Sequence, residues 1–190
     1  MRKRITLGVA MTGSFCTFSK VLTEIEKLAE NYDMIPIMSE FSSGTDTRFG
    51  KAEEHIERFE RASGRKIINS ITAAEPIGPK CLLDALVIIP CTGNTLGKLA
   101  NGITDTAVTM AAKANLRNGK PLIIGVSSND ALSASAKNIG LLMNVKNVFF
   151  IPLAQDDPLK KPTSAVCDFS RTDESIQAAL AGVQLQPILL

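Results

Sequence analysis

The sequence predicts an α/β fold in which helices cover both faces of a mainly parallel sheet of six strands, giving three layers. Two observations support this prediction. Short aliphatic runs of strand length alternate with segments whose apolar residues recur at helical spacing. Several of the short runs are apolar at every position, as expected for parallel strands buried on both faces. The 190 residues, 45% hydrophobic and 21% charged, contain no repeat or linker and are expected to form one domain, 1–190.

The elements are expected at the following positions. The strands are Ile5–Ala10, Met34–Met38, Lys66–Ile68, Leu86–Ile89, Leu122–Val126 and Val148–Leu153. The helices are Phe18–Glu30, Lys51–Ala62, Leu96–Ala100, Asp105–Ala114 and Asp173–Leu180. Pro90 is expected to end the fourth strand, and Asn94 or Thr95, then Thr104, are expected to cap the helices that follow. The segment 155–171 shows neither period and is expected to be a flap or a flexible loop.

Composition excludes several classes of function. A net charge of +2, one Tyr and no Trp argue against nucleic-acid binding, and no apolar run approaches the 18 residues of a membrane span. The charged start, Met1–Arg4, is interpreted as a solvated end before the first strand. The four cysteines have no metal-site spacing and the chain has a single histidine, so no metal site is expected and a reducing, cytoplasmic setting is the simplest interpretation. His55 lies among glutamates and is expected to be a solvated surface residue rather than a base.

Two stretches carry the candidate site. Pro90–Asp105 leads from a buried strand into two helix N-termini, and helix N-termini at the carboxyl end of a strand form anion sites. Met11–Thr17 is a short, hydroxyl-rich turn that contains Gly13 and Ser14. It lacks the dinucleotide fingerprint and the lysine of an ATP-binding loop, so a monophosphate is the ligand it fits. The alternative is that Gly13 is an ordinary turn residue.

These residues resemble the homo-oligomeric flavin-containing cysteine decarboxylase superfamily of flavoproteins. Gly13-Ser14 and the run Pro90-Cys91-Thr92-Gly93-Asn94-Thr95 through Lys98, Ala100, Gly102 and Asp105 follow its motif, roughly P-A-S-A-N-T-x-x-K-x-A-x-G-x-x-D. The resemblance implies a flavodoxin-like (Rossmann-like) fold, FMN as cofactor and a homo-oligomer built from trimers. An uncharged tail, 182–190, is an independent hint of association, unless it packs on the chain's own core.

Further blocks resemble the B-subunit family of dipicolinate synthases. They are Thr45–Gly50, Ala74–Lys80, Met110–Asn118, Ser128–Asp130 and Gln155–Pro158, and with the first motif they run nearly end to end. The resemblance implies an oxidoreductase that acts with a dehydrogenase-like A subunit to oxidise dihydrodipicolinate to dipicolinate, in the mother-cell cytoplasm of a sporulating bacterium. Removal of a hydride needs an acceptor, either a flavin or a nicotinamide, and the sequence leaves open which of the two polypeptides supplies it.

The resemblance assigns roles to individual residues. Gly13, Ser14 and Ser39 would hold the phosphate; Cys91, Thr92, Asn94, Thr95 and Asn129 would lie at the flavin. A dicarboxylate substrate also needs cations, and Arg48, Lys80 and Lys98 are the candidates because they lie in loops at strand ends. Arg48 and Asn94 are the candidate catalytic residues. Asn94 as a helix cap alone, and each cation as an ordinary surface charge, are the alternatives.

Two other functions stay open. An FMN-dependent decarboxylase is disfavoured, because its usual histidine before the fourth strand is replaced by Pro79–Asp84 and its P-A-M-N motif by Val126–Asn129. Parts of the chain, Met110–Asn129 especially, also resemble the flavin prenyltransferases but lack the Arg-Glu pair that those proteins have after the fifth strand. A noncatalytic subunit that keeps the fold and supports its partner is the remaining alternative.

Overall fold

The computed structural model describes residues 4–190, so the first three residues of the expected solvated end lie outside the described part. It is a single α/β domain with a mainly parallel sheet, as predicted, although the strands number seven. They run in the order β2-β1-β3-β4-β7-β6, with β5 also paired to β4. The strands are β1 (Thr6–Met11), β2 (Asp33–Met38), β3 (Ala85–Cys91), β4 (Leu122–Ser128), β5 (Val148–Phe150), β6 (Leu153–Asp157) and β7 (Lys161–Cys167).

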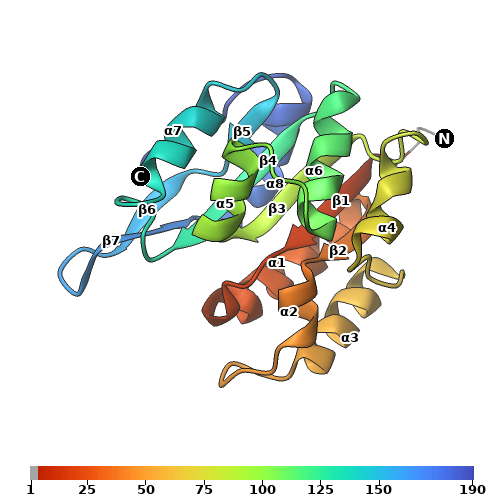
Figure 1. The fold of residues 1–190 in the computed structure, drawn as a ribbon, viewed down its shortest axis with the longest axis horizontal. Coiled ribbons are helices and arrows are strands. Elements are labelled where there is room, and N and C mark those ends of the chain that lie inside the picture. The colour runs from red at the N-terminus through yellow and green to blue at the C-terminus, as the bar shows by residue number, and fades with distance from the viewer. Residues whose placement is uncertain (1–3) are drawn as a thin grey trace.

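Helices cover both faces of the sheet (Figure 1). On one side α1 packs against the turn 169–171 that leads into α8, and the Tyr32 hydroxyl after α1 donates a hydrogen bond of 2.6 Å to Asp173 in α8. On the other side α6 packs against α4 and α5, and α5 packs against α7. The helices are α1 (Phe18–Asn31), α2 (Glu40–Gly44), α3 (Ala52–Ser63), α4 (Ile71–Ala74), α5 (Gly93–Ala100), α6 (Ala107–Arg117), α7 (Ala136–Met143) and α8 (Thr172–Leu180). Short 3-10 turns lie at Phe15–Thr17, Glu75–Ile77 and Phe169–Arg171.

The centre of the sheet forms the core. Every residue of β3 is buried, as the run of aliphatic residues predicted. Pro90 does not end this strand, which continues to Cys91 with a shift in register against β4. Proline has no N–H to donate, but the Pro90 carbonyl accepts hydrogen bonds from the backbone N–H and the hydroxyl of Thr12. The end of β3 is thereby joined to the loop after β1.

Two expected strands and the helix caps differ from the structure. Of Lys66–Ile68 only Ile68 pairs, through an isolated bridge to Ile37 in β2. The expected strand Val148–Leu153 is divided into β5 and β6 around Pro152. The caps are also different, since Thr92 caps α5 and Thr106 caps α6, each accepting a hydrogen bond from the N–H three residues on.

The segment 155–171 has regular structure, contrary to the expectation of a loop. β6 and β7 form an antiparallel hairpin, and β7 also pairs with Ser127 and Ser128 at the end of β4. Figure 1 shows the hairpin projecting from the body of the domain. The sequence did not indicate this structure because both strands are half exposed and contain charged residues, so neither shows an apolar run.

The C-terminal tail lies along the edge of β6. Leu153 donates to the Ile188 carbonyl and accepts from the N–H of Leu190, each at 2.8–2.9 Å. Ile188 packs against the core, whereas Leu189 and Leu190 stay 69% and 57% exposed. Within residues 4–190, no helix has the length and apolar character needed to cross a membrane.

Candidate functional site

The carboxyl ends of β1, β3 and β4 meet at one edge of the sheet and place three loops side by side. Thr12 joins the first two loops, because its hydroxyl donates to the Pro90 carbonyl at 2.7 Å and accepts from the Thr92 N–H at 3.0 Å. Ser14 joins the first and third loops through a hydroxyl contact of 2.8 Å with Ser127. The loops therefore form one hydrogen-bonded unit, at the edge where doubly wound sheets bind ligands.

One of two cavities at this edge lies among the starts of three helices, and we refer to it as the helix-end cavity. Its volume is about 550 Å³. It is lined by Thr12, Gly13, Ser39, Glu40, Phe41, Thr92, Asn94, Thr95, Lys98, Asp105 and Thr106. Six of the residues assigned from the sequence, Gly13, Ser39, Thr92, Asn94, Thr95 and Lys98, are thus brought together here.

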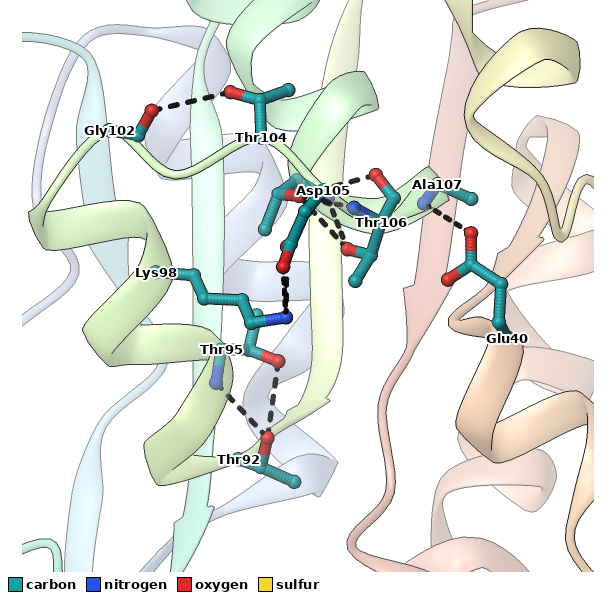
Figure 2. A network of polar contacts seen from close by, with 10 residues as sticks. Glu40, Thr92, Thr95, Lys98, Gly102, Thr104, Asp105, Thr106 and Ala107 are labelled. Carbon is teal, nitrogen blue, oxygen red and sulfur yellow. Dashed lines mark hydrogen bonds and ion pairs between the residues drawn. The ribbon is translucent and has the colours of Figure 1, made fainter.

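Charged and hydroxyl groups in the helix-end cavity already have protein partners (Figure 2). The Glu40 carboxylate accepts a hydrogen bond of 3.2 Å from the N–H of Ala107, the first residue of α6. Lys98 and Asp105 form an ion pair at 2.8 Å. Ser39 caps α2, with its hydroxyl accepting from the Ser42 N–H. Asn94 does not cap α5, and its exposed side chain has no hydrogen-bond partner among the described residues.

Gly13 lets the first loop pass close to an aromatic side chain. A Cβ at this position would lie 3.0 and 3.2 Å from two ring atoms of Phe41, closer than nine in ten real Cβ contacts. The Phe41 ring is 63% exposed and meets Phe15 edge-on, with 5.6 Å between ring centroids. Phe41 thus offers an exposed aromatic surface at the rim of the helix-end cavity.

The second cavity lies under the β6–β7 hairpin, and we refer to it as the hairpin cavity. Its volume is about 920 Å³, and it shares Gly13 and Thr92 with the helix-end cavity. Its polar lining includes Ser14, Cys16, Lys20, Glu24, Ser127, Ser128, Asn129, Asp130, Asp156, Lys161, Ser164 and Asp168. Ser14 and Asn129, assigned to the flavin from the sequence, therefore face this cavity rather than the helix-end cavity.

The hairpin supplies part of the wall and is bonded to the loop after β4. The Thr163 hydroxyl donates to the Asn129 carbonyl at 2.7 Å, and the Ser164 hydroxyl donates to the Asn129 side chain at 3.4 Å. Lys161 pairs with Asp156 at 2.8 Å, and its hydrogen bond lowers the pKa of the Asp156 carboxyl. The cavity thus combines many hydroxyl groups with charges of both signs.

Asp130 places a carboxylate over the start of α5. A Cβ on Gly93, the first residue of that helix, would lie 2.6 Å from the Asp130 carboxylate and from the Ser135 hydroxyl. At α6 the Glu40 carboxylate accepts a hydrogen bond from the first N–H, whereas in the described chain Asp130 lies near the start of α5 without a hydrogen bond to it. Each of the two helix N-termini expected to form an anion site therefore has a carboxylate of the chain itself beside it.

Other residues assigned from the sequence lie outside both cavities. Arg48 stacks over the ring of its neighbour Phe49, 4.8 Å from the ring centroid, in the loop between α2 and α3. Lys80 precedes β3 and so lies at the amino ends of the strands, the opposite edge of the sheet. Cys91 is fully buried in β3, and burial raises the pKa of its thiol far above the usual range.

His55 is not the solvated residue expected from its charged neighbours. Its Nε2 atom is buried without a hydrogen-bond partner, and its ring meets Phe18 edge-on at 5.1 Å. Desolvation lowers the pKa of this imidazole. The ring lies on the side of α3 that packs against the core, although the neighbouring glutamates in the sequence indicated an exposed position.

Sequence reasoning missed most of the lining of the hairpin cavity. The sequence did indicate three of these residues. They are the near neighbours of Asn129 at the end of a buried strand, where such sheets bind ligands: Ser127, Ser128 and Asp130. Lys161 and Ser164 gave no such signal, because only strand pairing brings the hairpin over the site. Glu40 follows the assigned Ser39 directly, but nothing in the sequence relates it to α6.

The fold is Rossmann-like, and comparison with known proteins shows the family. The Flavoprotein family profile matches residues 1–181, and the chain belongs to that family. It is 46% identical over 185 residues to the B subunit of dipicolinate synthase from Bacillus subtilis, covering 97% of this chain and 92% of that protein. It is 27% identical to a putative phosphopantothenoylcysteine decarboxylase of Dictyostelium discoideum, covering 84% and 81%.

Solved structures show the same similarity. The crystal structure of the dipicolinate synthase B subunit from Bacillus halodurans C matches with a TM-score of 0.90 and 44% identity, covering 98% of this chain and 96% of that one. The FMN-dependent cysteine decarboxylase SpaF matches with a TM-score of 0.64 at 18% identity, covering 94% and 97%. The second likeness is one of fold.

Proposed function

We propose that the chain is the flavin-binding B subunit of a dipicolinate synthase and acts with an A subunit to oxidise dihydrodipicolinate to dipicolinate. Its identity of 46% to the Bacillus subtilis protein over almost the whole chain carries this proposal. The two adjoining cavities support it, because a redox reaction needs an acceptor and a substrate in contact. Gly13 and Thr92 line both cavities, so ligands in the two would meet there.

The helix-end cavity is the proposed site for FMN. Its walls offer donors without charge, among them the Asn94 amide and the hydroxyls of Thr95 and Thr106, and the exposed Phe41 ring suits a planar ligand. These groups fit the ring and the ribityl chain of a flavin. When bound, FMN would supply a hydride acceptor.

The hairpin cavity is the proposed site for the dicarboxylate substrate. The hydroxyls of Ser14, Ser127 and Ser164 line it and are able to donate to carboxylate oxygens. Lys161 provides a positive charge from the hairpin, at present shared with Asp156. Lys98 in the neighbouring cavity is the one cation assigned from the sequence that lies close to this arrangement. Arg48 and Lys80 line neither cavity of the described chain.

A noncatalytic supporting role is the second candidate. It is favoured by one observation: the carboxylates of Glu40 and Asp130 lie at the two helix N-termini where an anionic ligand would be expected. In that case the chain would be needed for the stability of the A subunit and would bind no flavin.

Two measurements separate these functions. Flavin absorbance and fluorescence titration of the purified chain test for FMN, and formation of dipicolinate is followed with both subunits, with each alone, and with Ser127→Ala. The catalytic proposal expects saturable FMN binding, activity only with both subunits, and a loss of about 10-fold or more in Ser127→Ala, the cost of a hydrogen bond to a charged group. Full activity of the A subunit alone would exclude it.

A further inference from the structure

The helix-end cavity carries an excess of negative charge. Lys98 is its only cation among residues 4–190, and that ammonium is already paired with Asp105 at 2.8 Å. Glu40 adds a second carboxylate, for which no cation lies within ion-pairing distance in the described chain. A phosphate entering this cavity would therefore meet more negative than positive charge.

Glu40 also occupies the place that a phosphate would use. Its carboxylate accepts from the Ala107 N–H at 3.2 Å, at the start of an α6 helix of 11 residues (Figure 2). Free amide N–H groups and a positive dipole end are what make a helix N-terminus bind anions. At α6 the N–H of Ala107 is already engaged by a carboxylate of the same protein, which also lies at the positive end of the helix dipole. The hydroxyl of Ser39, the expected phosphate donor that lines this cavity, is engaged with Ser42.

We propose that Glu40 is a specificity-determining residue that opposes the phosphate of a flavin, so that this chain holds flavin through its ring and ribityl chain rather than through its phosphate. This inference rests on the proposed flavin site. It predicts that FMN and riboflavin, which differ by the phosphate alone, bind the wild-type chain with affinities within about threefold of each other.

Glu40→Gln removes the charge and keeps the structural contact, because the glutamine side-chain oxygen is still able to accept from Ala107. We expect FMN to bind this variant about tenfold more tightly, which is the effect of one screened unit charge on a phosphate dianion in a partly solvated cavity. Riboflavin affinity should stay within twofold of wild type. The gain for FMN should shrink as salt is raised, since the interaction is electrostatic.

Glu53→Gln is the matched control. Glu53 lies exposed in the first turn of α3, outside both cavities, and its replacement changes the net charge of the chain by the same amount. Flavin fluorescence titrations compare FMN and riboflavin on the wild-type chain and both variants. An equal gain in Glu53→Gln, or an unchanged ratio of FMN to riboflavin affinity in Glu40→Gln, would overturn the proposal.

A titration with inorganic phosphate tests the inference without any flavin. The amide signal of Ala107 is followed by NMR, and we expect saturable shifts in Glu40→Gln at phosphate concentrations that leave the wild-type signal unchanged. Equal shifts in both proteins, or none in either, would refute the role of Glu40. Absence of flavin binding together with a phosphate response confined to Glu40→Gln would instead refute the proposed cofactor and support the role of Glu40.

Discussion

Replacing Gly93 with alanine tests how tightly the loop after β4 packs on the start of α5. The new Cβ would lie 2.6 Å from both the Asp130 carboxylate and the Ser135 hydroxyl, and 2.9 Å from the Ser128 hydroxyl. These side chains are short and the loop is held by its own turns, with the N–H groups of Ser133 and Ser135 both donating to the Asp130 carbonyl at 3.0 Å. The loop must therefore move as a whole.

The cost follows from two opposing effects. Overpacking at a tight site destabilises by roughly 1–3 kcal/mol. Alanine restricts the unfolded chain and returns about 0.4–1 kcal/mol of that. We expect a net loss of about 1–2 kcal/mol in the free energy of unfolding. In a chain of this size the loss lowers Tm by roughly 2–8 °C.

Gly97→Ala in the same helix is the control. A Cβ there meets only the Asn138 side chain, at an ordinary 3.5 Å, so the better helix propensity of alanine should raise stability by about 0.5–1 kcal/mol. Urea and thermal unfolding of both variants give the comparison. A Gly93→Ala protein as stable as Gly97→Ala would refute the close packing of Asp130 on α5.

Three further outcomes are expected. Thr92→Ala should lower the free energy of unfolding by about 1 kcal/mol through loss of the α5 cap, measured by urea unfolding, whereas Thr92→Ser should keep most of it. The ion pair of Asp156 with Lys161 lowers the folded pKa of the carboxyl, so its contribution is present above the unfolded pKa of about 3.9 and is lost as pH falls through the folded value. The stability difference between wild type and Lys161→Gln should therefore vanish towards pH 2, and a difference independent of pH would contradict this. A thiol reagent should modify two cysteines in the native protein and all four after unfolding, because Cys16 and Cys81 are exposed while Cys91 and Cys167 are buried with raised pKa. Four fast thiols in the native chain would disprove the burial.

The parallel part of the fold could be predicted because its strands are buried on both faces. Such strands are apolar at almost every position, and β3 and β4 are therefore recognisable from the sequence alone. The hairpin could not be predicted in this way. Its two strands pair with each other, and β7 also pairs with the end of β4. A half-exposed strand that contains charged residues shows no regular alternation of apolar residues that would distinguish it from a loop.

The candidate site was predictable at the level of strand ends and not at the level of side chains. The residues after β1, β3 and β4 do converge, as the topology requires. Which cavity each one faces depends on hydrogen bonds of particular side chains, such as that of Ser14 to Ser127. The position of Glu40 against α6 depends on how α2 packs, a contact between residues 67 positions apart.

Very few strand pairings join the hairpin to the rest of the sheet. β5 pairs with residues 122–124 of β4, and β7 takes only Ser127 and Ser128 on the same side. The tip at residues 158–160 lies beyond all of these pairings, and Leu159 there is 94% exposed. Insertions or deletions at the tip would leave every parallel strand in register, and they would reach the hairpin cavity only through Lys161, which lies next to the tip and lines that cavity. The architecture thus separates a constant scaffold from a turn that evolution or engineering can vary while the fold stays the same.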